Sequence, residues 1–376
     1  MSEIRTILYD PQSFNSSRCV FTIPRGLVIN AQKIRICDFK ISNKSGNGIY
    51  FNHAGVYSLL SKVSILSLQG TEIDYLSNME MMSIKLLQME NASQFSVNRQ
   101  LSQSMCNSVF VNNLGQASLT ELKGGDDGSA MSIYWDISLM LSYLQRRVVI
   151  DEGMTILLEF ASPDVLGFNY EFSSPPSLAV DEFLTSVPKD NLQVLSYTTI
   201  IQDKLILPTG STGFEKRLNS FYNQFLGRIY FMNILNKAEN PFINAIDKTG
   251  QSLNILIDGK QIIPLKGIDN PAKKLGFIND FTSPFTIPAY SSALNLLSSD
   301  KSFTNVNNGL DYRNTFSYGC VSLNRFVGND ITFDYSFTLP IVSQSGETLL
   351  VMAEVLRQYD SVADRVSFVS SQVVPS

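Results

Sequence analysis

Short apolar segments that end at turn residues recur along the whole chain. This alternation of short segments and turns constrains the fold more than any other feature. The clearest case is a hairpin in which Ser64–Leu68 is an apolar strand, Gln69–Gly70 supplies the turn and Thr71–Leu76 is the second strand. Lys33–Ile41 alternates apolar and polar residues with a period of two, as a half-buried strand does. Such segments predict a protein built from short strands.

The same pattern continues to the end of the chain. Asp258–Gly259 is a strong hairpin dipeptide, and Ser252–Ile257 and Lys260–Ile263 flank it as strands. Short helices are predicted from Asn78 onward and over Ser138–Leu144. Further strands are predicted at Arg18–Ile23, Ser132–Asp136, Thr155–Phe160, Val194–Ile201, Lys204–Leu207, Arg228–Leu235, Asp330–Leu339 and Thr348–Tyr359. Strands and helices do not alternate, which favours sandwiches or jelly rolls.

The length of 376 residues is enough for two domains of ordinary size. A short apolar strand closed by Pro-x-Gly occurs at Val20–Gly26 and again at Lys204–Gly210, about half a chain apart, as a duplicated domain would place it. We therefore predict an all-β fold of two tandem eight-stranded jelly-roll sandwiches, with a few short helices in loops. The predicted parts are an N-terminal arm over 1–17, a first jelly roll over 18–162, an irregular proline-containing linker over 163–190, a second jelly roll over 191–365 and a C-terminal tail over 366–376.

The charge balance argues against direct packaging of nucleic acid. The formal net charge is −5, and the best basic runs are only Arg146–Arg147 and Lys273–Lys274. Because affinity for nucleic acid comes mostly from Lys and Arg contacts to phosphate, we expect no direct sequence-specific nucleic-acid binding. Charged residues make up 17% of the chain. This low fraction fits a surface that neighbours cover, and equally a β-rich chain in which Ser, Thr and Asn replace charge.

The cysteines and the apolar segments indicate a reducing, soluble compartment for synthesis. Cys19, Cys37, Cys106 and Cys320 lack the spacing of a metal cluster or a disulfide framework, and we predict that they are reduced core residues. The start of the sequence has no apolar signal region. No run approaches the length of a membrane span.

Residues that could carry catalysis are scarce or unpatterned. His53 is the only histidine, so neither a cupin-type metal site nor a Ser-His-Asp device is expected. Gly210–Arg217 lacks P-loop spacing. Asp126 and Asp127 lack the ligand pattern of an EF-hand, although a loosely bound surface ion stays open there. The carboxylates on or near strands that could pair as in a glycosidase are Glu152, Glu159, Glu171, Asp334 and Glu354. With so many acidic residues this signal has little specificity, and we predict no enzyme and no catalytic, cofactor-binding or metal-binding residues.

Four segments carry a family likeness. They are Gly55–Leu76, with an apolar strand and a hairpin; Asp136–Phe160, a helix followed by a strand; Leu253–Ile268, a second hairpin; and the closing strands Leu323–Phe337 and Leu349–Tyr359. In pattern and order the chain resembles the double jelly-roll major capsid proteins of tailless double-stranded DNA viruses and polinton-like elements. The likeness covers about a third of the chain, and none of the segments is a strict motif.

The resemblance implies a mechanical role. Three chains would form a pseudo-hexagonal homotrimeric capsomer, and such capsomers would tile an icosahedral virus shell. The implied partners are other copies of the chain, neighbouring capsomers and minor capsid or penton proteins, with an internal membrane left open. The implied location is the virion capsid, assembled inside the host cell. The alternatives are a minor or vertex capsid protein of the same lineage, and a two-domain carbohydrate-binding or glycoside-cleaving β protein.

Overall fold

The chain divides into two compact units in the computed structural model. Unit 1 comprises Met1–Met89, Ser93–Thr199 and Arg357–Ser367, and unit 2 comprises Glu90–Ala92, Ile200–Leu356 and Phe368–Ser376. The structure describes residues 4–46, 59–77, 110–111, 117–118, 131–136, 147–150, 153–166, 168–184, 194–234, 252–257, 259–266, 318–327, 331–336 and 348–368. In this part of the chain, strands dominate and no helix is long and apolar enough to cross a membrane.

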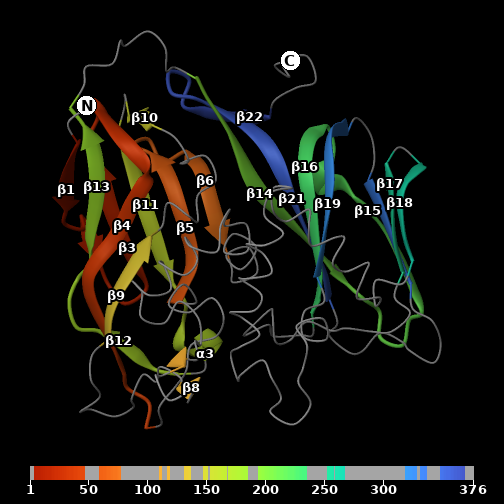
Figure 1. Cartoon of the computed structure of the whole chain (residues 1–376), viewed down its shortest axis with the longest axis horizontal. Helices are drawn as coiled ribbons and strands as arrows, with labels where there is room; N and C mark the ends of the chain where they lie inside the picture. Colours follow the sequence, from red (N-terminus) through yellow and green to blue (C-terminus); the bar gives the residue numbers. More distant parts are fainter. Residues whose placement is uncertain are drawn as a thin grey trace. The chain divides into compact units, whose positions relative to one another are not determined.

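The first half of the chain forms two antiparallel sheets (Figure 1). The six-stranded sheet has the order β1 (Ile4–Tyr9), β13 (Ser177–Phe183), β4 (Leu27–Asn43) and β10 (Arg147–Ile150), with β9 (Met131–Asp136) and β12 (Tyr170–Phe172) also paired to β4. The five-stranded sheet has the order β2 (Ser13–Phe14), β3 (Arg18–Ile23), β11 (Met154–Phe160), β5 (Leu60–Ser67) and β6 (Glu72–Ser77). The small pair β7 (Phe110–Val111) and β8 (Ala117–Ser118) is separate, and α3 (Pro163–Leu166) is a single helical turn.

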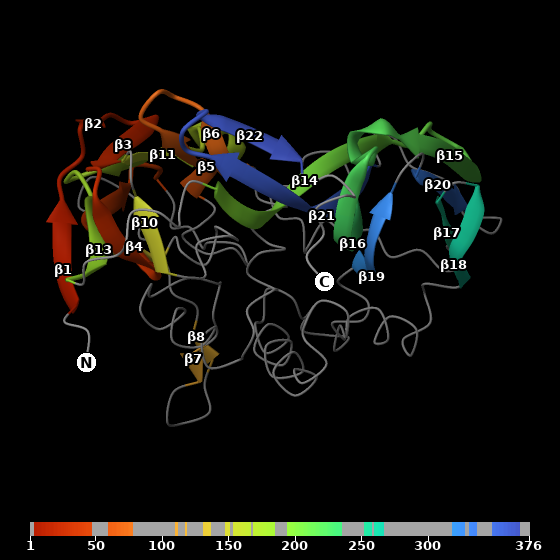
Figure 2. The same ribbon diagram turned by 90° about the horizontal axis from the view of Figure 1, so that it is seen from above.

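The second half forms two further sheets (Figure 2). One has the order β14 (Val194–Ile206), β21 (Thr348–Asp360), β16 (Gln224–Ile234) and β19 (Tyr318–Val327), with β22 (Arg365–Phe368) paired to β21. The other has the order β15 (Gly213–Leu218), β20 (Ile331–Ser336), β17 (Ser252–Ile257) and β18 (Lys260–Lys266). The 3-10 turn η4 (Asn219–Phe221) joins β15 to β16. Pro264 falls in β18, which ends its sheet, where a residue without an N–H is tolerated.

The core of unit 1 is organised by strict alternation along two of its strands, β3 and β11. In β3, Cys19, Phe21 and Ile23 are fully buried, while the residues between them are partly exposed. In β11 the alternation is equally regular. Ile156 is paired to Phe21 on one side and to Ile65 of β5 on the other, so three buried side chains lie in one row on the inner face. Because alternate side chains point to opposite faces, this pattern gives the sheet one apolar face to bury.

The predicted all-β fold class is confirmed, and several predicted strands match the structure closely. Arg18–Ile23 and Ser252–Ile257 match β3 and β17 at both ends. The two predicted strands Val194–Ile201 and Lys204–Leu207 form one continuous strand, β14. Gly26 and Gly210, which close the repeated Pro-x-Gly segments, both have positive φ, at 82° and 77°. The two predicted helices lie outside the described residues.

The segments predicted as arm, linker and tail each contain part of a strand. Ile4–Tyr9, in the predicted arm, forms β1, and Ser177–Phe183, in the predicted linker, forms β13; the two strands pair along their whole length. Arg365–Phe368, at the start of the predicted tail, forms β22. β1 and β13 gain strand structure from partners distant in sequence, which local pattern does not reveal, whereas β22 pairs with the neighbouring strand β21. The first half therefore holds more strands than the eight that were predicted.

The turn before β11 leaves no room for a side chain at Gly153. Its φ is +83°, and a Cβ there would lie 2.8 Å from Cδ1 of Leu68 and 3.0 Å from the carbonyl oxygen of Ile23. Gly26 has nearly the same φ, +82°, but faces open space. Both positions need a residue that tolerates positive φ, but only Gly153 also needs the absence of a side chain. Comparing them therefore separates the cost of backbone strain from the cost of steric contact.

We expect Gly153→Ala to destabilise the protein more than Gly26→Ala. Both variants place a non-glycine residue at positive φ, which costs about 1–2 kcal/mol. Only Gly153→Ala also forces its Cβ against the Leu68 side chain and the Ile23 carbonyl oxygen. Urea unfolding curves of the two variants measure the difference. Equal losses of stability would show that the contact with Ile23 and Leu68 is unimportant.

Candidate functional site

Two of the carboxylates considered as a catalytic pair each lie beside a different basic residue. Glu159, on β11, is paired in register with Arg18. The Glu171 carboxylate accepts from the Lys44 ammonium at 3.2 Å. The exposed Lys44–Glu171 ion pair fits a solvated sheet surface better than a glycosidase centre, where two carboxyl groups must face one substrate.

The remaining candidates add no site in the described part of the chain. Glu354, on β21, accepts a hydrogen bond from the backbone N–H of Arg228 at 3.2 Å and faces its guanidinium at 3.8 Å. Asp334 lies on β20, and its side chain is outside the described residues. No group of three or more His, Cys, Asp or Glu able to hold a metal occurs among the residues described. His53, Asp126, Asp127 and Glu152 lie outside them.

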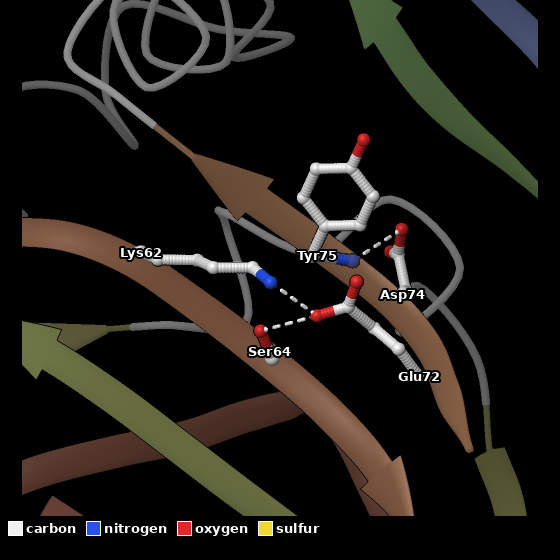
Figure 3. A network of polar contacts seen from close by, with 5 residues as sticks. All are labelled: Lys62, Ser64, Glu72, Asp74 and Tyr75. Atoms are coloured by element: carbon white, nitrogen blue, oxygen red, sulfur yellow. Dashed lines mark hydrogen bonds and ion pairs between the residues drawn. The ribbon is translucent and has the colours of Figure 1, made fainter.

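The hairpin β5–β6 carries a compact polar network (Figure 3). The Lys62 ammonium and the Ser64 hydroxyl both donate to Oε1 of Glu72, at 2.5 Å and 2.9 Å. The Lys62 ammonium also lies 4.9 Å from the centre of the Tyr75 ring, at cation–π distance. Lys62 and Ser64 come from β5, and Glu72 and Tyr75 come from β6.

The network does not have the arrangement of a nucleophilic site. An activated serine must donate its proton to a base that faces the substrate. The Ser64 hydroxyl is fully buried and donates to a carboxylate that already neutralises Lys62. These contacts instead join side chains of β5 to side chains of β6 and so stabilise the pairing of the two hairpin strands.

Strand β6 also contacts a segment from much later in the sequence, within unit 1. The Asp74 carboxylate, 4% exposed, accepts from the Thr199 hydroxyl at 2.5 Å, and the Tyr197 hydroxyl donates to the backbone carbonyl of Ile73. Burial, followed by the nearby Asp74 charge, raises the pKa of Tyr197 well above its usual range. This tyrosine therefore stays a neutral hydrogen-bond donor.

The turn between β21 and β22 also contacts the β5–β6 hairpin. The Asp364 carboxylate accepts from the hydroxyl groups of Thr71, at 2.8 Å, and Tyr359, at 2.9 Å. Burial raises the pKa of Asp364, but hydrogen bonds from Thr71, Ser67 and Tyr359 outweigh it, so the net pKa is lowered. Asp364 has a φ of 45°, a conformation that Asp and Asn tolerate better than most residues.

An aromatic groove of about 420 Å³ lies beside β2 and β12 in unit 1. Its rings contact one another, with Phe160 and Phe172 at 4.5 Å between centroids and Phe14 and Phe172 at 5.5 Å. The Tyr170 hydroxyl donates to the carbonyl of Ala161 at 2.7 Å, and burial raises its pKa to about 12. The polar groups at the groove are short Ser and Asn side chains and Glu171, a set without an activated base.

The pairing of β1 with β13 brings together charges that the sequence analysis did not consider. The Arg5 guanidinium donates to Glu182 at 2.6 Å. On the opposite strand face, Asp181 accepts from the Arg35 guanidinium and from the Thr6 hydroxyl, both at 2.7 Å. Asp181 and Glu182 are only 6% and 8% exposed. Adjacent acidic residues in an otherwise apolar segment were the available signal, because buried carboxylates need partners.

We expect Asp181→Asn to reduce stability much more than Glu171→Gln. The Asp181 side chain is 9% exposed and serves two donors, whereas the Glu171–Lys44 pair is exposed on both sides, at 68% and 36%. A buried charged hydrogen bond is worth about 1.5–3 kcal/mol, and an exposed pair about 0–1 kcal/mol. Denaturant titration of both variants measures the contrast, and comparable effects would contradict the buried network.

We expect the contribution of Asp364 to stability to depend on pH. Because its folded pKa is lowered, its ionised form stabilises the protein at neutral pH, and this stabilisation is lost as the pH falls through the lowered pKa. Asp364→Asn, which tolerates the positive φ, should therefore be less stable than the wild type at pH 7 and equal to it in strong acid. Unfolding midpoints across pH test this, with exposed Asp10→Asn as the control. If Asp364→Asn remained less stable than the wild type in strong acid, the loss of stability would come from packing and not from the charge.

The evidence for the fold from known proteins comes from solved structures. No protein-family model matches the chain, and no curated protein matches it. Among solved structures, one of the Sputnik virophage aligns over 97% of this chain and 88% of its own, with a TM-score of 0.60 and 8% identity. The PBCV-1 virus capsid aligns over 98% of both chains, with a TM-score of 0.54 and 12% identity.

A third structure, of Sulfolobus Turreted Icosahedral Virus, aligns over 94% of this chain and 90% of its own, with a TM-score of 0.51 and 12% identity. All three alignments span both halves of the chain, as expected for two tandem jelly rolls. The chain therefore has the double jelly-roll fold of viral capsid proteins.

Proposed function

We propose that the chain is a structural capsid protein that does no chemistry. The observation that supports this most is the alignment of nearly the whole chain with the PBCV-1 virus capsid, over nearly the whole length of that chain too. Little of the sequence is left over for a separate catalytic domain. The described residues contain well-partnered carboxylates and no metal-binding group, which fits a shell component.

In this proposal the chain is the major capsid protein and forms homotrimers. Two jelly rolls per chain, the first of them including β1 and β13, give six per trimer and hence a pseudo-hexagonal capsomer. A closed ring of identical subunits uses heterologous contacts, and permanent assemblies bury about 2,000 Å² or more per interface. Capsomers of this shape would tile an icosahedral shell and meet minor capsid or penton proteins, and the protein would reside in the virion.

We expect the full-length protein, purified alone, to have the mass of three chains in sedimentation and light-scattering measurements. Negatively stained micrographs should show pseudo-hexagonal blocks or larger closed particles. A ring of five chains would support the vertex-protein alternative instead. A chain that stays monomeric at every concentration, and that binds immobilised glycans, would contradict the capsid proposal and favour the carbohydrate-binding alternative.

A further inference from the structure

Strand β1 leaves one edge of the six-stranded sheet open. It is hydrogen-bonded to β13 along one side, from Ile4 opposite Phe183 to Tyr9 opposite Leu178. Figures 1 and 2 both show β1 at the end of this sheet. Among the described residues no strand pairs with its other side. Backbone N–H and C=O groups along such an edge form a template for a further strand.

This edge lacks the devices that usually protect a sheet from unwanted pairing. Its sequence, IRTILY, contains no proline and no lysine, and its register with β13 shows no bulge. Its only charge, on Arg5, already donates to Glu182 at 2.6 Å. Six residues of high β propensity and low free charge on an open edge favour association with another strand.

The exposed side chains of β1 are also apolar. Ile4 is 50% exposed and Leu8 61% exposed, two of the larger apolar side chains left on the surface of the described chain. Alternation along the strand places Ile4, Thr6 and Leu8 on one face. Thr6 lies midway between the two apolar residues and is held in place by its hydrogen bond to Asp181. The exposed face of β1 is therefore nearly symmetric about Thr6, with one large apolar side chain two residues to either side.

We propose that β1 pairs antiparallel with β1 of a second copy, about a two-fold axis that passes through Thr6. In this register Thr6 lies opposite Thr6 of the partner subunit, and Ile4 lies opposite Leu8 of the partner subunit. The two exposed apolar side chains of each copy thereby cover those of the other, so the Ile4–Leu8 contact forms twice. A Thr–Thr pair is also favourable across strands. An isologous contact of this kind needs only one self-complementary surface.

Neighbouring registers satisfy these conditions less well. An axis through Arg5 would place two like charges directly opposite each other, which is destabilising. An axis through Ile7 would place Leu8 against Thr6 and leave Ile4 beyond the apolar contact. The choice of a second copy as occupant rests on the proposed function, because a shell brings many copies of the same edge to high local concentration.

Cysteine cross-linking tests the register directly. Opposite Cα atoms in an antiparallel pair lie about 4.5–5.5 Å apart, within the range of a disulfide at about 4.4–6.8 Å. Thr6→Cys should therefore form disulfide-linked dimers under mild oxidation, beyond any background from the native cysteines in the wild type. Ile4→Cys alone should not, because its two copies would lie about 13 Å apart. Mixing Ile4→Cys with Leu8→Cys should restore the cross-link.

A charge variant tests the energetic role of the edge without a new bond. Leu8→Lys should weaken the two-fold association at least tenfold in sedimentation equilibrium, since it places an ammonium against an apolar side chain. Val362→Lys is the matched control, because Val362 is 72% exposed in the turn after β21 and lies outside β1. Val362→Lys should leave the association unchanged.

The outcomes separate this inference from the proposed function. Particles that form normally while Thr6→Cys gives no dimer, or while Ile4→Cys cross-links equally well, would overturn the β1 contact and leave the capsid role standing. Cross-linked Thr6→Cys dimers without trimers or particles would support the β1 contact and contradict the shell. A chain that neither associates nor cross-links would overturn both.

Discussion

The structure depends on one constraint, which is that each sheet must bury one face while its strands stay in fixed register. In unit 1 the pairing of β3, β11 and β5 aligns Phe21, Ile156 and Ile65 in a row of fully buried side chains. A shift of one residue in any of these strands would expose its whole apolar set. The tight turn at Gly153 supports this register, because it brings the start of β11 against Leu68 and Ile23.

Polar side chains follow the same geometry and connect strands that are distant in sequence. Arg5 reaches Glu182, Thr6 and Arg35 share Asp181, and Lys62 pairs with Glu72. These contacts run between neighbouring strands of a sheet or across a hairpin. The charges therefore stabilise pairing and register, and they leave no activated group facing a substrate in the part of the chain that the structure describes.

In the proposed capsid role, the protein works through its edges and faces. The aromatic groove beside β12 has walls of packed rings, and burial keeps the Tyr170 hydroxyl protonated there. The edge of β1 that no described strand covers instead combines backbone hydrogen-bonding groups with exposed apolar side chains. Association through surfaces rather than chemistry in a pocket fits the low charge fraction of the sequence, 17%. It also fits a double jelly-roll fold that viral capsid structures share at very low sequence identity.

The sequence by itself determined the strand content, the all-β class and most turns, because alternation, prolines and glycines act locally. Arg18–Ile23 and Ser252–Ile257 could be predicted at both ends for this reason. Only the tertiary structure decided that Ile4–Tyr9 is a strand, since its hydrogen bonds come from Ser177–Phe183, more than 160 residues away. The tertiary structure alone also decided the hydrogen-bond partners of Asp74 and Asp364, because Thr199 and Thr71 lie far from them in the sequence. Local patterns specify which segments can form strands, but pairing between distant segments selects the edges, and those edges determine where the molecule can associate.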